Sequence, residues 1–122
     1  MHLLTHLLAR ILIAIPFGVF GFFHLTNSEG MATMLPESLP YGQVWVIITG
    51  ITLILCSISI IIMKYNKIAG FVAAAFMLLT ILFVHVPLLS DPARMAMTAI
   101  LKDLSIMGGS LLVAGLTKRE SF

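Results

Sequence analysis

Charged residues are scarce in this sequence of 122 residues, of which only 10% are Asp, Glu, Lys or Arg. Soluble domains carry about 25% of such residues. Hydrophobic residues make up 60% of the chain, and the mean hydropathy is +1.11. A soluble domain of this length has too little interior to bury so many apolar side chains. The scarcity of charge therefore excludes an ordinary soluble domain and predicts a protein embedded in a lipid bilayer.

Cysteine is nearly absent, because Cys56 is the single cysteine of the chain. One cysteine forms neither an internal disulfide nor a dithiol redox pair, which argues against a thiol-relay enzyme. Cys56 lies in an apolar run and is expected to pack as a small hydrophobic side chain. A net charge of +2 gives no indication of nucleic-acid binding. The sequence also contains no catalytic Ser-His-Asp set and no phosphate-binding loop.

Four apolar stretches have the length of roughly 20 residues that a helix needs to span a bilayer. They cover residues 3–25, 42–63, 68–89 and 92–117. The connections between them are short, so consecutive helices are expected to pack antiparallel. The sequence thus predicts an all-α integral membrane protein, an up-down bundle of four transmembrane helices that forms a single domain over residues 1–122.

Helix-breaking residues predict where these helices bend and end. Pro16 lies inside the first helix and should kink it. Residues 26–41 are rich in turn residues, and residues 64–67 predict a tight turn. Before the fourth helix, Asp91 suits the N-cap and Pro92 suits the first helical position.

The distribution of charge predicts the orientation of the bundle. Glu29 and Glu37 lie in the first connection and Arg94 in the third. The other basic residues that flank the helices fall on the opposite side: Arg10, Lys64, Lys67, Lys118 and Arg119. The positive-inside rule then places both termini in the cytoplasm. We expect a retained first helix rather than a cleaved signal peptide, and a multi-pass protein of the bacterial inner (cytoplasmic) membrane.

Two charged residues, Lys102 and Asp103, lie within the predicted fourth helix, about ten residues from its start. A charge at the centre of a spanning helix costs about 2.5–3.5 kcal/mol on insertion scales, so both residues need a reason to be there. Being adjacent, they are separated by about 100° on a helical wheel and are not expected to face each other. We therefore expect each to find a partner on another helix.

The helical wheel of the fourth helix separates small from bulky side chains. Small and polar residues share the broad face of Lys102 and Asp103: Ala99, Ser105, Gly109, Ser110 and Ala114. Bulky residues share the opposite face: Ile100, Leu104, Met107 and Leu111. The first face suits helix packing and the second suits lipid. Lys102 and Asp103 are therefore expected to point toward the interior of the bundle or its edge.

Two histidines are candidate partners for this pair, since His24 ends the first helix and His85 lies near the end of the third. Both helix ends are on the predicted outer side. The outer half of the bundle is thus expected to gather His24, His85, Lys102 and Asp103 into a ligand-binding site. Small residues on the first and third helices would permit the close approach that this requires. They are Gly18, Gly21, Ala69, Gly70, Ala73 and Ala74.

Structural roles for the same residues stay open from sequence alone. His24 fits an interfacial position at the lipid headgroups, and His85 fits hydrogen bonding to carbonyls released by Pro87. Lys102 has a stem long enough to reach the membrane surface, and Asp103 fits the neutralisation of a nearby cation. A haem between His24 and His85 rests on weak evidence, and a metal ion would lack further ligands, so no metal is predicted.

The order of several motifs resembles the DoxX-like family of small four-helix membrane proteins. The matching segments are Gly21–Leu25, Met31–Pro40, Gly50, Lys67–Gly70 and Lys102–Gly109. The resemblance implies a four-helix membrane fold and marks His24, Lys102 and Asp103 as family positions. Members resemble membrane subunits of redox systems, including thiosulfate:quinone oxidoreductase, and distant relatives resemble assembly factors or cargo receptors. Many members carry a glutamate one turn after the second-helix glycine, where this sequence has Thr52 and Leu53.

These observations favour an accessory subunit of a redox or quinone-linked membrane system, with a quinone as the candidate ligand. Lys102 would stabilise an oxyanion, and His24 or His85 would hydrogen-bond a carbonyl or carry a proton. The alternative is a non-enzymatic assembly factor or packing partner for a larger membrane complex. Either function implies contact with the lipid bilayer and with a protein partner or further copies of the chain. Whether the protein is an enzyme stays open from sequence alone.

Overall fold

The structure, a computed structural model, describes residues 2–37, 39–92 and 95–116. Four helices in this part of the chain are long and apolar enough to cross a membrane, which confirms the predicted all-α bundle of transmembrane helices. The spans are α1 (His2–Thr26), α3 (Gly42–Ile62), α4 (Asn66–Thr80), which two short elements continue to Leu88, and α5 (Ala96–Leu116). Short elements complete the fold: α2 (Ser28–Ala32), the π-helix η1 (Ile81–His85) and the 3-10 helix η2 (Val86–Leu88).

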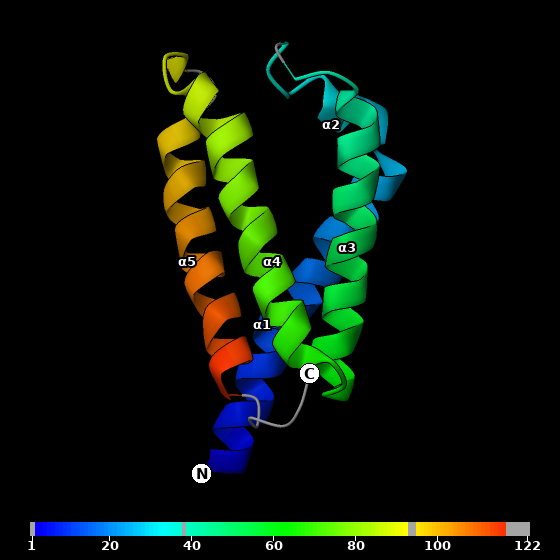
Figure 1. Cartoon of the computed structure of the whole chain (residues 1–122), viewed down its shortest axis with the longest axis vertical. Coiled ribbons are helices and arrows are strands. Elements are labelled where there is room, and N and C mark those ends of the chain that lie inside the picture. The colour runs from blue at the N-terminus through cyan, green and yellow to red at the C-terminus, as the bar shows by residue number, and fades with distance from the viewer. Residues whose placement is uncertain (1, 38, 93–94, 117–122) are drawn as a thin grey trace.

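The helices pack as two close pairs, α1 with α3 and α4 with α5 (Figure 1). In the first pair, a Cβ atom added to Gly21 would lie 2.7 Å from the Gly50 carbonyl oxygen. In the second pair, a Cβ added to Gly70 would lie 2.5 Å from the Ser110 carbonyl oxygen. Glycine at these positions lets the two backbones meet, as expected where lipid removes the hydrophobic driving force between helices. The close-approach role predicted for Gly21 and Gly70 is therefore confirmed.

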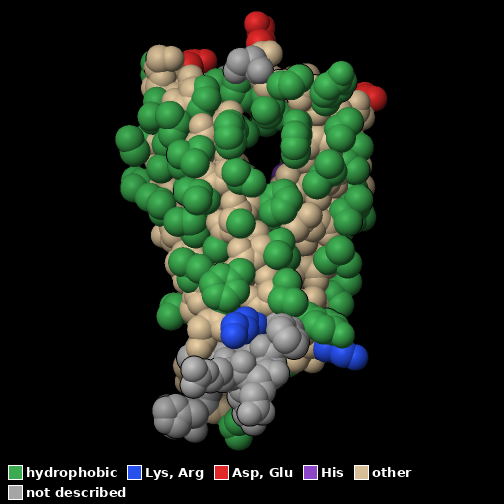
Figure 2. Space-filling view, in the orientation of Figure 1, with side chains coloured by type: hydrophobic (Ala, Val, Ile, Leu, Met, Phe, Trp, Pro, Cys, Tyr) green, Lys and Arg blue, Asp and Glu red, His purple; other side chains and the backbone are tan. Residues whose placement is uncertain are grey.

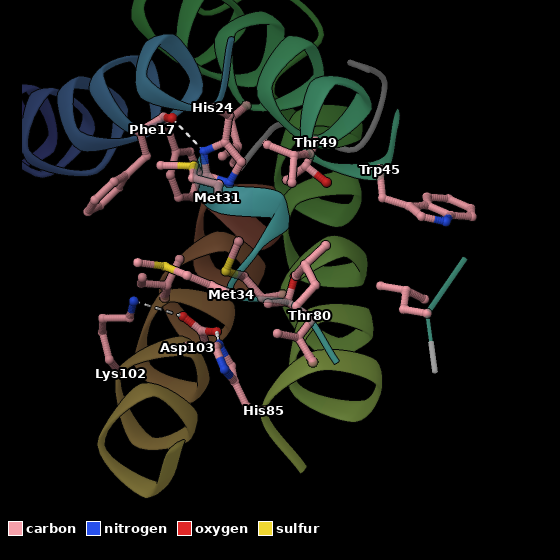
Figure 3. Close-up of a pocket in the computed structure, with 18 residues that line it drawn as sticks. Phe17, His24, Met31, Met34, Trp45, Thr49, Thr80, His85, Lys102 and Asp103 are labelled. Atoms are coloured by element: carbon pink, nitrogen blue, oxygen red, sulfur yellow. Dashed lines mark hydrogen bonds and ion pairs between the residues drawn. The ribbon is translucent and has the colours of Figure 1, made fainter. Parts of the chain in front are cut away.

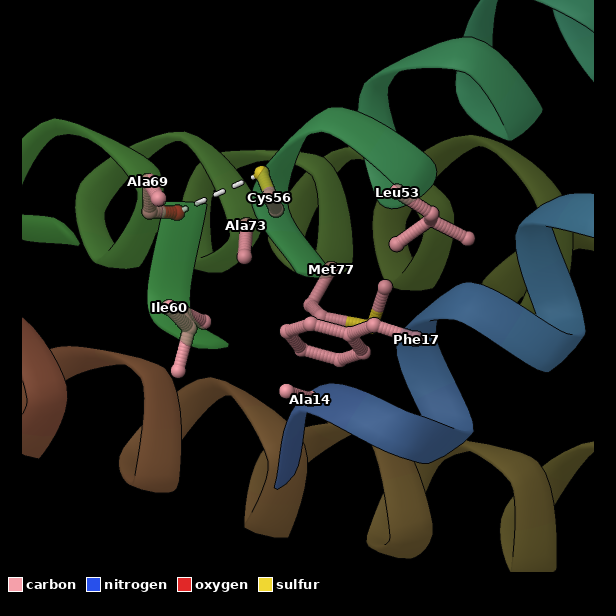
Figure 4. Packing of buried hydrophobic residues seen from close by; sticks show 8 residues of the cluster. All are labelled: Ala14, Phe17, Leu53, Cys56, Ile60, Ala69, Ala73 and Met77. Atoms are coloured by element: carbon pink, nitrogen blue, oxygen red, sulfur yellow. Dashed lines mark hydrogen bonds between the residues drawn. The ribbon is translucent and has the colours of Figure 1, made fainter. Parts of the chain in front are cut away.

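A compact apolar core joins the two pairs from the middle of the bundle toward the α3–α4 turn (Figure 4). Its buried members come from three helices: Ala14, Phe17, Leu53, Cys56, Ile60, Ala69, Ala73 and Met77. Cys56 is 4% exposed, with Sγ 3.5 Å from the Ala69 carbonyl oxygen, so it packs as predicted. Ser57 donates a 2.6 Å hydrogen bond to the Ala14 carbonyl oxygen and ties α3 to α1. The core holds α3 and α4 together near their connecting turn.

The two ends of the bundle differ in charge (Figure 2). Glu29, Glu37 and Asp91 belong to the end that carries α2, whereas Lys64 and Lys67 flank the α3–α4 turn at the opposite end. α1 begins and α5 ends at this basic end (Figure 1). Arg94, Lys118 and Arg119, which contributed to the predicted orientation, lie outside the described residues.

The fourth transmembrane helix begins at Ala96, so the predicted start at residue 92 is wrong. The Asp91 N–H bonds to the Leu88 carbonyl oxygen and closes the turn after η2. Met95 has a left-handed backbone with φ 50°, and its carbonyl accepts the first helical bond, from the Ala99 N–H. The predicted end of the fourth helix at Thr117 lies outside the described residues. In the first helix, α1 continues through Pro16 as one helix.

The Gly70 contact predicts a large effect of a small substitution. Gly70→Ala should lower the free energy of unfolding in detergent by about 1–3 kcal/mol, because the new methyl group meets backbone atoms of α5 that cannot move aside. The measurement is helix content by circular dichroism during titration with a denaturing detergent. Gly108→Ala is the matched control, since nothing lies within 4 Å of its added Cβ. The control should leave stability unchanged or raise it by up to about 1 kcal/mol. Equal effects of both substitutions would contradict the packing described here.

Candidate functional site

A cavity of about 370 Å³ lies within the half of the bundle that carries α2 (Figure 3). Its wall is mostly apolar and includes Phe17 and Phe20 of α1, Trp45 of α3 and Ile106 of α5. Six polar residues complete the lining: His24, Thr49, Thr80, His85, Lys102 and Asp103. Ligand pockets in proteins typically have volumes of about 300–1,000 Å³, apolar walls and a few placed polar groups. The cavity therefore has the size and chemistry of a site for a small amphiphilic molecule.

The cavity exists because α3 and α4 separate above the apolar core. The two helices join through a short turn at the basic end and diverge toward the α2 end (Figure 1). The molecular surface has an opening between α3 and α4 in that half (Figure 2). Trp45 and Thr49 on α3, and Thr80 and Val84 on α4, line the cavity from these two helices. In a membrane, an opening between two spanning helices faces the lipid chains.

His85 reaches the cavity from the last residue of the π-helix η1. Pro87 has no N–H for the Phe83 carbonyl, and its ring crowds that carbonyl. The chain responds by widening the turn, and the Val86 N–H bonds to the Ile81 carbonyl oxygen. Single π-turns of this kind occur frequently at functional sites. Pro87 is therefore the local cause of the π-turn, and the π-turn carries His85, which bonds to Asp103 of α5.

His85 and Asp103 form a hydrogen-bonded pair across two helices. His85 Nε2 lies 2.9 Å from Asp103 Oδ2, and the two side chains are 19% and 5% exposed. A carboxylate accepts hydrogen bonds, so we assign the donor proton to Nε2. A neutral His85 then carries an acceptor at Nδ1. The prediction that Asp103 has a partner on another helix is confirmed, and His85 uses this carboxylate in place of a backbone carbonyl.

Lys102 lies at the edge of the same cluster. Its Nζ is 3.5 Å from Asp103 Oδ1 and 5.9 Å from the centre of the Phe20 ring, and its side chain is 56% exposed. The expectation that Lys102 and Asp103 do not face each other is wrong, because the flexible lysine stem folds back across the angle between them. Lys102 is also nearer the helix start than predicted, about 9 Å along the axis from Ala96. The ammonium group balances the Asp103 carboxylate, and its contact with another helix is to an aromatic ring.

His24 lies on the α1 side of the cavity and is not hydrogen-bonded to the other three residues. Its Nδ1 donates a 2.6 Å hydrogen bond to the Phe20 carbonyl oxygen, so a neutral His24 carries its acceptor at Nε2. Gly50 accommodates it, since a Cβ added there would lie 2.8 Å from His24 Cβ. All four predicted site residues line one cavity, as expected. In its neutral form, each imidazole donates its one N–H to the protein and keeps the other nitrogen as an acceptor.

The buried face of α5 is rotated by about one residue from the face that the helical wheel predicts. Ala96, Asp103 and Ser110 are buried at seven-residue intervals, together with Ala114. Ser105 was predicted on the buried face and is exposed, whereas Met107 was predicted to face lipid and packs against the core. The face of α5 that packs against α4 includes Asp103, and its buried residues follow the seven-residue repeat of antiparallel helices.

The connection between α1 and α3 contributes a part of the wall that the sequence did not reveal. Met31, Met34, Leu35 and Leu39 line the cavity from this segment. The α2 residue Ser28 accepts a 3.2 Å hydrogen bond from Gln43 Nε2, which ties the segment to α3. The sequence feature that could have indicated this wall is the run of apolar residues among turn residues, since a wholly exposed loop is polar.

In the described part of the chain, no three His, Cys, Asp or Glu side chains are grouped closely enough to hold a metal ion.

Comparison with known proteins identifies one family. A family model described as "Domain of unknown function (DUF8561)" matches residues 13–106, which include all four candidate site residues. No curated protein and no solved structure matches the chain.

The His85–Asp103 pair predicts a measurable coupling. A double-mutant cycle with His85→Phe and Asp103→Leu should give an interaction energy of about 1–2 kcal/mol in unfolding experiments, because each single change leaves a polar partner buried and unsatisfied. The comparison cycle, Lys102→Met with Asp103→Leu, should give less than about 1 kcal/mol, because Lys102 is largely exposed. Additive single effects in the His85–Asp103 cycle would contradict the assigned hydrogen bond.

Proposed function

Because this chain belongs to the DUF8561 family, we propose its function from the cavity itself: it binds a quinone-class molecule from the bilayer as an accessory subunit of a redox system. We place it in the bacterial cytoplasmic membrane with both termini inside. The supporting observation is one lipid-side cavity that joins an apolar wall to the His85–Asp103–Lys102 cluster. A quinone has this character, since it joins a polar ring to an apolar tail.

The hydrogen-bonding state of the two histidines favours the reduced form of such a ligand. His24 donates Nδ1–H to Phe20, and His85 donates Nε2–H to Asp103. The ring nitrogens that remain are acceptors, and the hydroxyl groups of a quinol are donors. His85 Nδ1 would accept a hydroxyl proton, and Asp103 would stabilise the resulting imidazolium. Lys102 would stabilise negative charge that develops on the ligand oxygen. The protein's part is thus to orient the ring and hold a proton.

The resemblance to DoxX-like proteins is consistent with this proposal, and one difference modifies it. Leu53 falls in the stretch where many DoxX-like proteins have a glutamate, and it is 3% exposed on the cavity wall. Asp103 on α5 is the one carboxylate among the described lining residues. Proton chemistry in this chain would therefore depend on the imidazole–carboxylate pair between η1 and α5.

Binding can be measured with the protein's own fluorophore. Trp45 lines the cavity and is the single tryptophan of the sequence, so a quinone that enters should quench its fluorescence. The titration uses purified protein in lipid nanodiscs and a short-chain ubiquinone. His85→Gln and His24→Ala should each weaken binding about tenfold, which corresponds to one lost hydrogen bond to a charged or polarised partner. Lys102→Ala should also weaken binding.

The control for this titration is Ser105→Ala, an exposed position on α5 away from the cavity lining. It should bind ubiquinone as the unaltered protein does. Unchanged quenching in the His24, His85 and Lys102 variants would place the ligand elsewhere, and absence of saturable quenching in the unaltered protein would contradict the proposed function.

The acceptor nitrogens predict a preference between redox forms. The unaltered protein should bind reduced short-chain ubiquinol more tightly than oxidised ubiquinone, so the quinol should displace the quinone at a concentration below that of the quinone. In His85→Gln this preference should shrink toward equal affinity, because the proton-accepting nitrogen is lost. Competition measured by recovery of Trp45 fluorescence under anaerobic conditions reports the ratio. Tighter binding of the oxidised form by the unaltered protein would contradict the assigned tautomers.

A second candidate function is that of a packing partner or assembly factor for a larger membrane complex. The observation in its favour is a pair of exposed glycines on one face of α5, Gly108 and Gly115. Nothing lies within 4 Å of a Cβ added at either glycine, so a second helix has room to approach there. Co-purification of a protein partner that is lost in Gly108→Leu, with ubiquinone binding absent, would favour this function over the first.

A further inference from the structure

A second hollow lies at the opposite, basic end of the bundle. It has a volume of about 480 Å³ and is lined by His6 and Arg10 of α1, by Leu3 and Leu7 of the same helix, and by Met63. Met63 is the C-cap of α3, with a left-handed backbone of φ 56°. His6 and Arg10 are four residues apart, so their side chains lie on one face of α1. The hollow thus combines two nitrogen-bearing side chains with three apolar ones and is separate from the cavity near α2.

The Arg10 side chain has one donor, Nε, without a partner among the residues that the structure describes. Its Nε is buried, and no hydrogen-bond acceptor satisfies it within the described part of the chain. A guanidinium carries five N–H donors in a planar fork and stays charged at all physiological pH values. A buried donor without an acceptor costs free energy. Oxyanions that accept two parallel hydrogen bonds, such as phosphate, match the geometry of this fork.

The depth of the hollow corresponds to the headgroup layer of a bilayer. α3 has 21 residues and is about 31 Å long, which equals the thickness of the hydrocarbon core of about 30 Å. Met63 follows the last helical residue of α3, so it marks the boundary between hydrocarbon and headgroups. His6 and Arg10 line the same hollow as Met63 and therefore lie at that boundary. α1 has 25 residues and extends beyond it into the headgroup region (Figure 1).

We propose that this hollow binds the phosphate of an anionic phospholipid, with Arg10 as the principal ligand and His6 as a second donor. Met63, at the hydrocarbon boundary, supplies an apolar contact for the glycerol and the upper acyl chain, whereas Leu3 and Leu7 lie on the headgroup side of Arg10. Lys64 and Lys67 lie at the same end of the bundle and raise the local concentration of anionic lipid. A free phosphate ion offers the same oxygens to Arg10 but gains nothing from Met63 at the hydrocarbon boundary. The lipid is therefore the occupant that the depth of the hollow favours.

The experiment compares lipid binding in the intact protein and matched variants. Protein is reconstituted in phosphatidylcholine nanodiscs that contain a small fraction of phosphatidylglycerol, and retained lipid is counted by native mass spectrometry after release. Arg10→Gln should reduce retained phosphatidylglycerol about tenfold. Arg10→Lys, which keeps the charge but loses the fork, should retain less than the unaltered protein and more than Arg10→Gln. Circular dichroism checks that each variant keeps its helix content.

Lys67→Gln is the matched control, because it removes one positive charge from the same end without touching the hollow. It should change retention less than about threefold, as expected for a screened surface charge. Equal losses in Arg10→Gln and Lys67→Gln would overturn the site, since general electrostatics would then explain binding. No loss in Arg10→Gln, or equal retention in Arg10→Gln and Arg10→Lys, would overturn the role of the guanidinium fork.

A second arm distinguishes lipid from free phosphate. Inorganic phosphate at millimolar concentration should not displace phosphatidylglycerol from the unaltered protein. Displacement at that concentration would overturn the lipid as occupant and identify a site for the free ion. Since this site lies at the other end of the bundle, its outcome is independent of ubiquinone binding in the cavity near α2.

Discussion

A carboxylate buried within the membrane is the constraint on which the rest of this structure depends. Asp103 is 4% exposed on a transmembrane helix, where an unpaired charge costs about 2.5–3.5 kcal/mol. A hydrogen bond from His85 and the nearby Lys102 ammonium group stabilise the carboxylate and offset this free-energy cost. His85 can reach Asp103 because Pro87 induces the π-turn η1, which ends at His85. The position of Asp103 on the buried seam of α5 thus determines which side chains gather around the cavity.

Helix packing explains why a cavity is present beside this carboxylate. Gly21, Gly50 and Gly70 let helices meet backbone to backbone within each pair, which concentrates close packing there. Between the pairs, contact depends on the apolar core near the α3–α4 turn. Above that core the side chains of α3 and α4 no longer meet, and the segment around α2 covers the space that they leave. The same arrangement therefore provides both rigidity at the basic end and an opening toward lipid at the other.

The sequence predicted the parts of this structure that follow from composition and periodicity. The four membrane spans follow from apolar runs of the right length, and the gathering of His24, His85, Lys102 and Asp103 follows from an antiparallel order of helices. The contact between Lys102 and Asp103 did not follow, because a wheel ignores the reach of a flexible stem. The start of α5 at Ala96 depends on the left-handed backbone of Met95, and no residue preference in the sequence indicates one there.

The protonation of His85 tests the central claim most directly. Nitrogen-15 spectra of the protein in lipid membranes distinguish a ring nitrogen that carries a proton from one that does not. The proposed function requires a neutral ring with a protonated Nε2 that is hydrogen-bonded to Asp103, and a bare Nδ1 whose signal shifts when a short-chain ubiquinol is added. A proton on Nδ1 in the ligand-free protein, or an Nδ1 signal that ubiquinol leaves unchanged, would contradict the account.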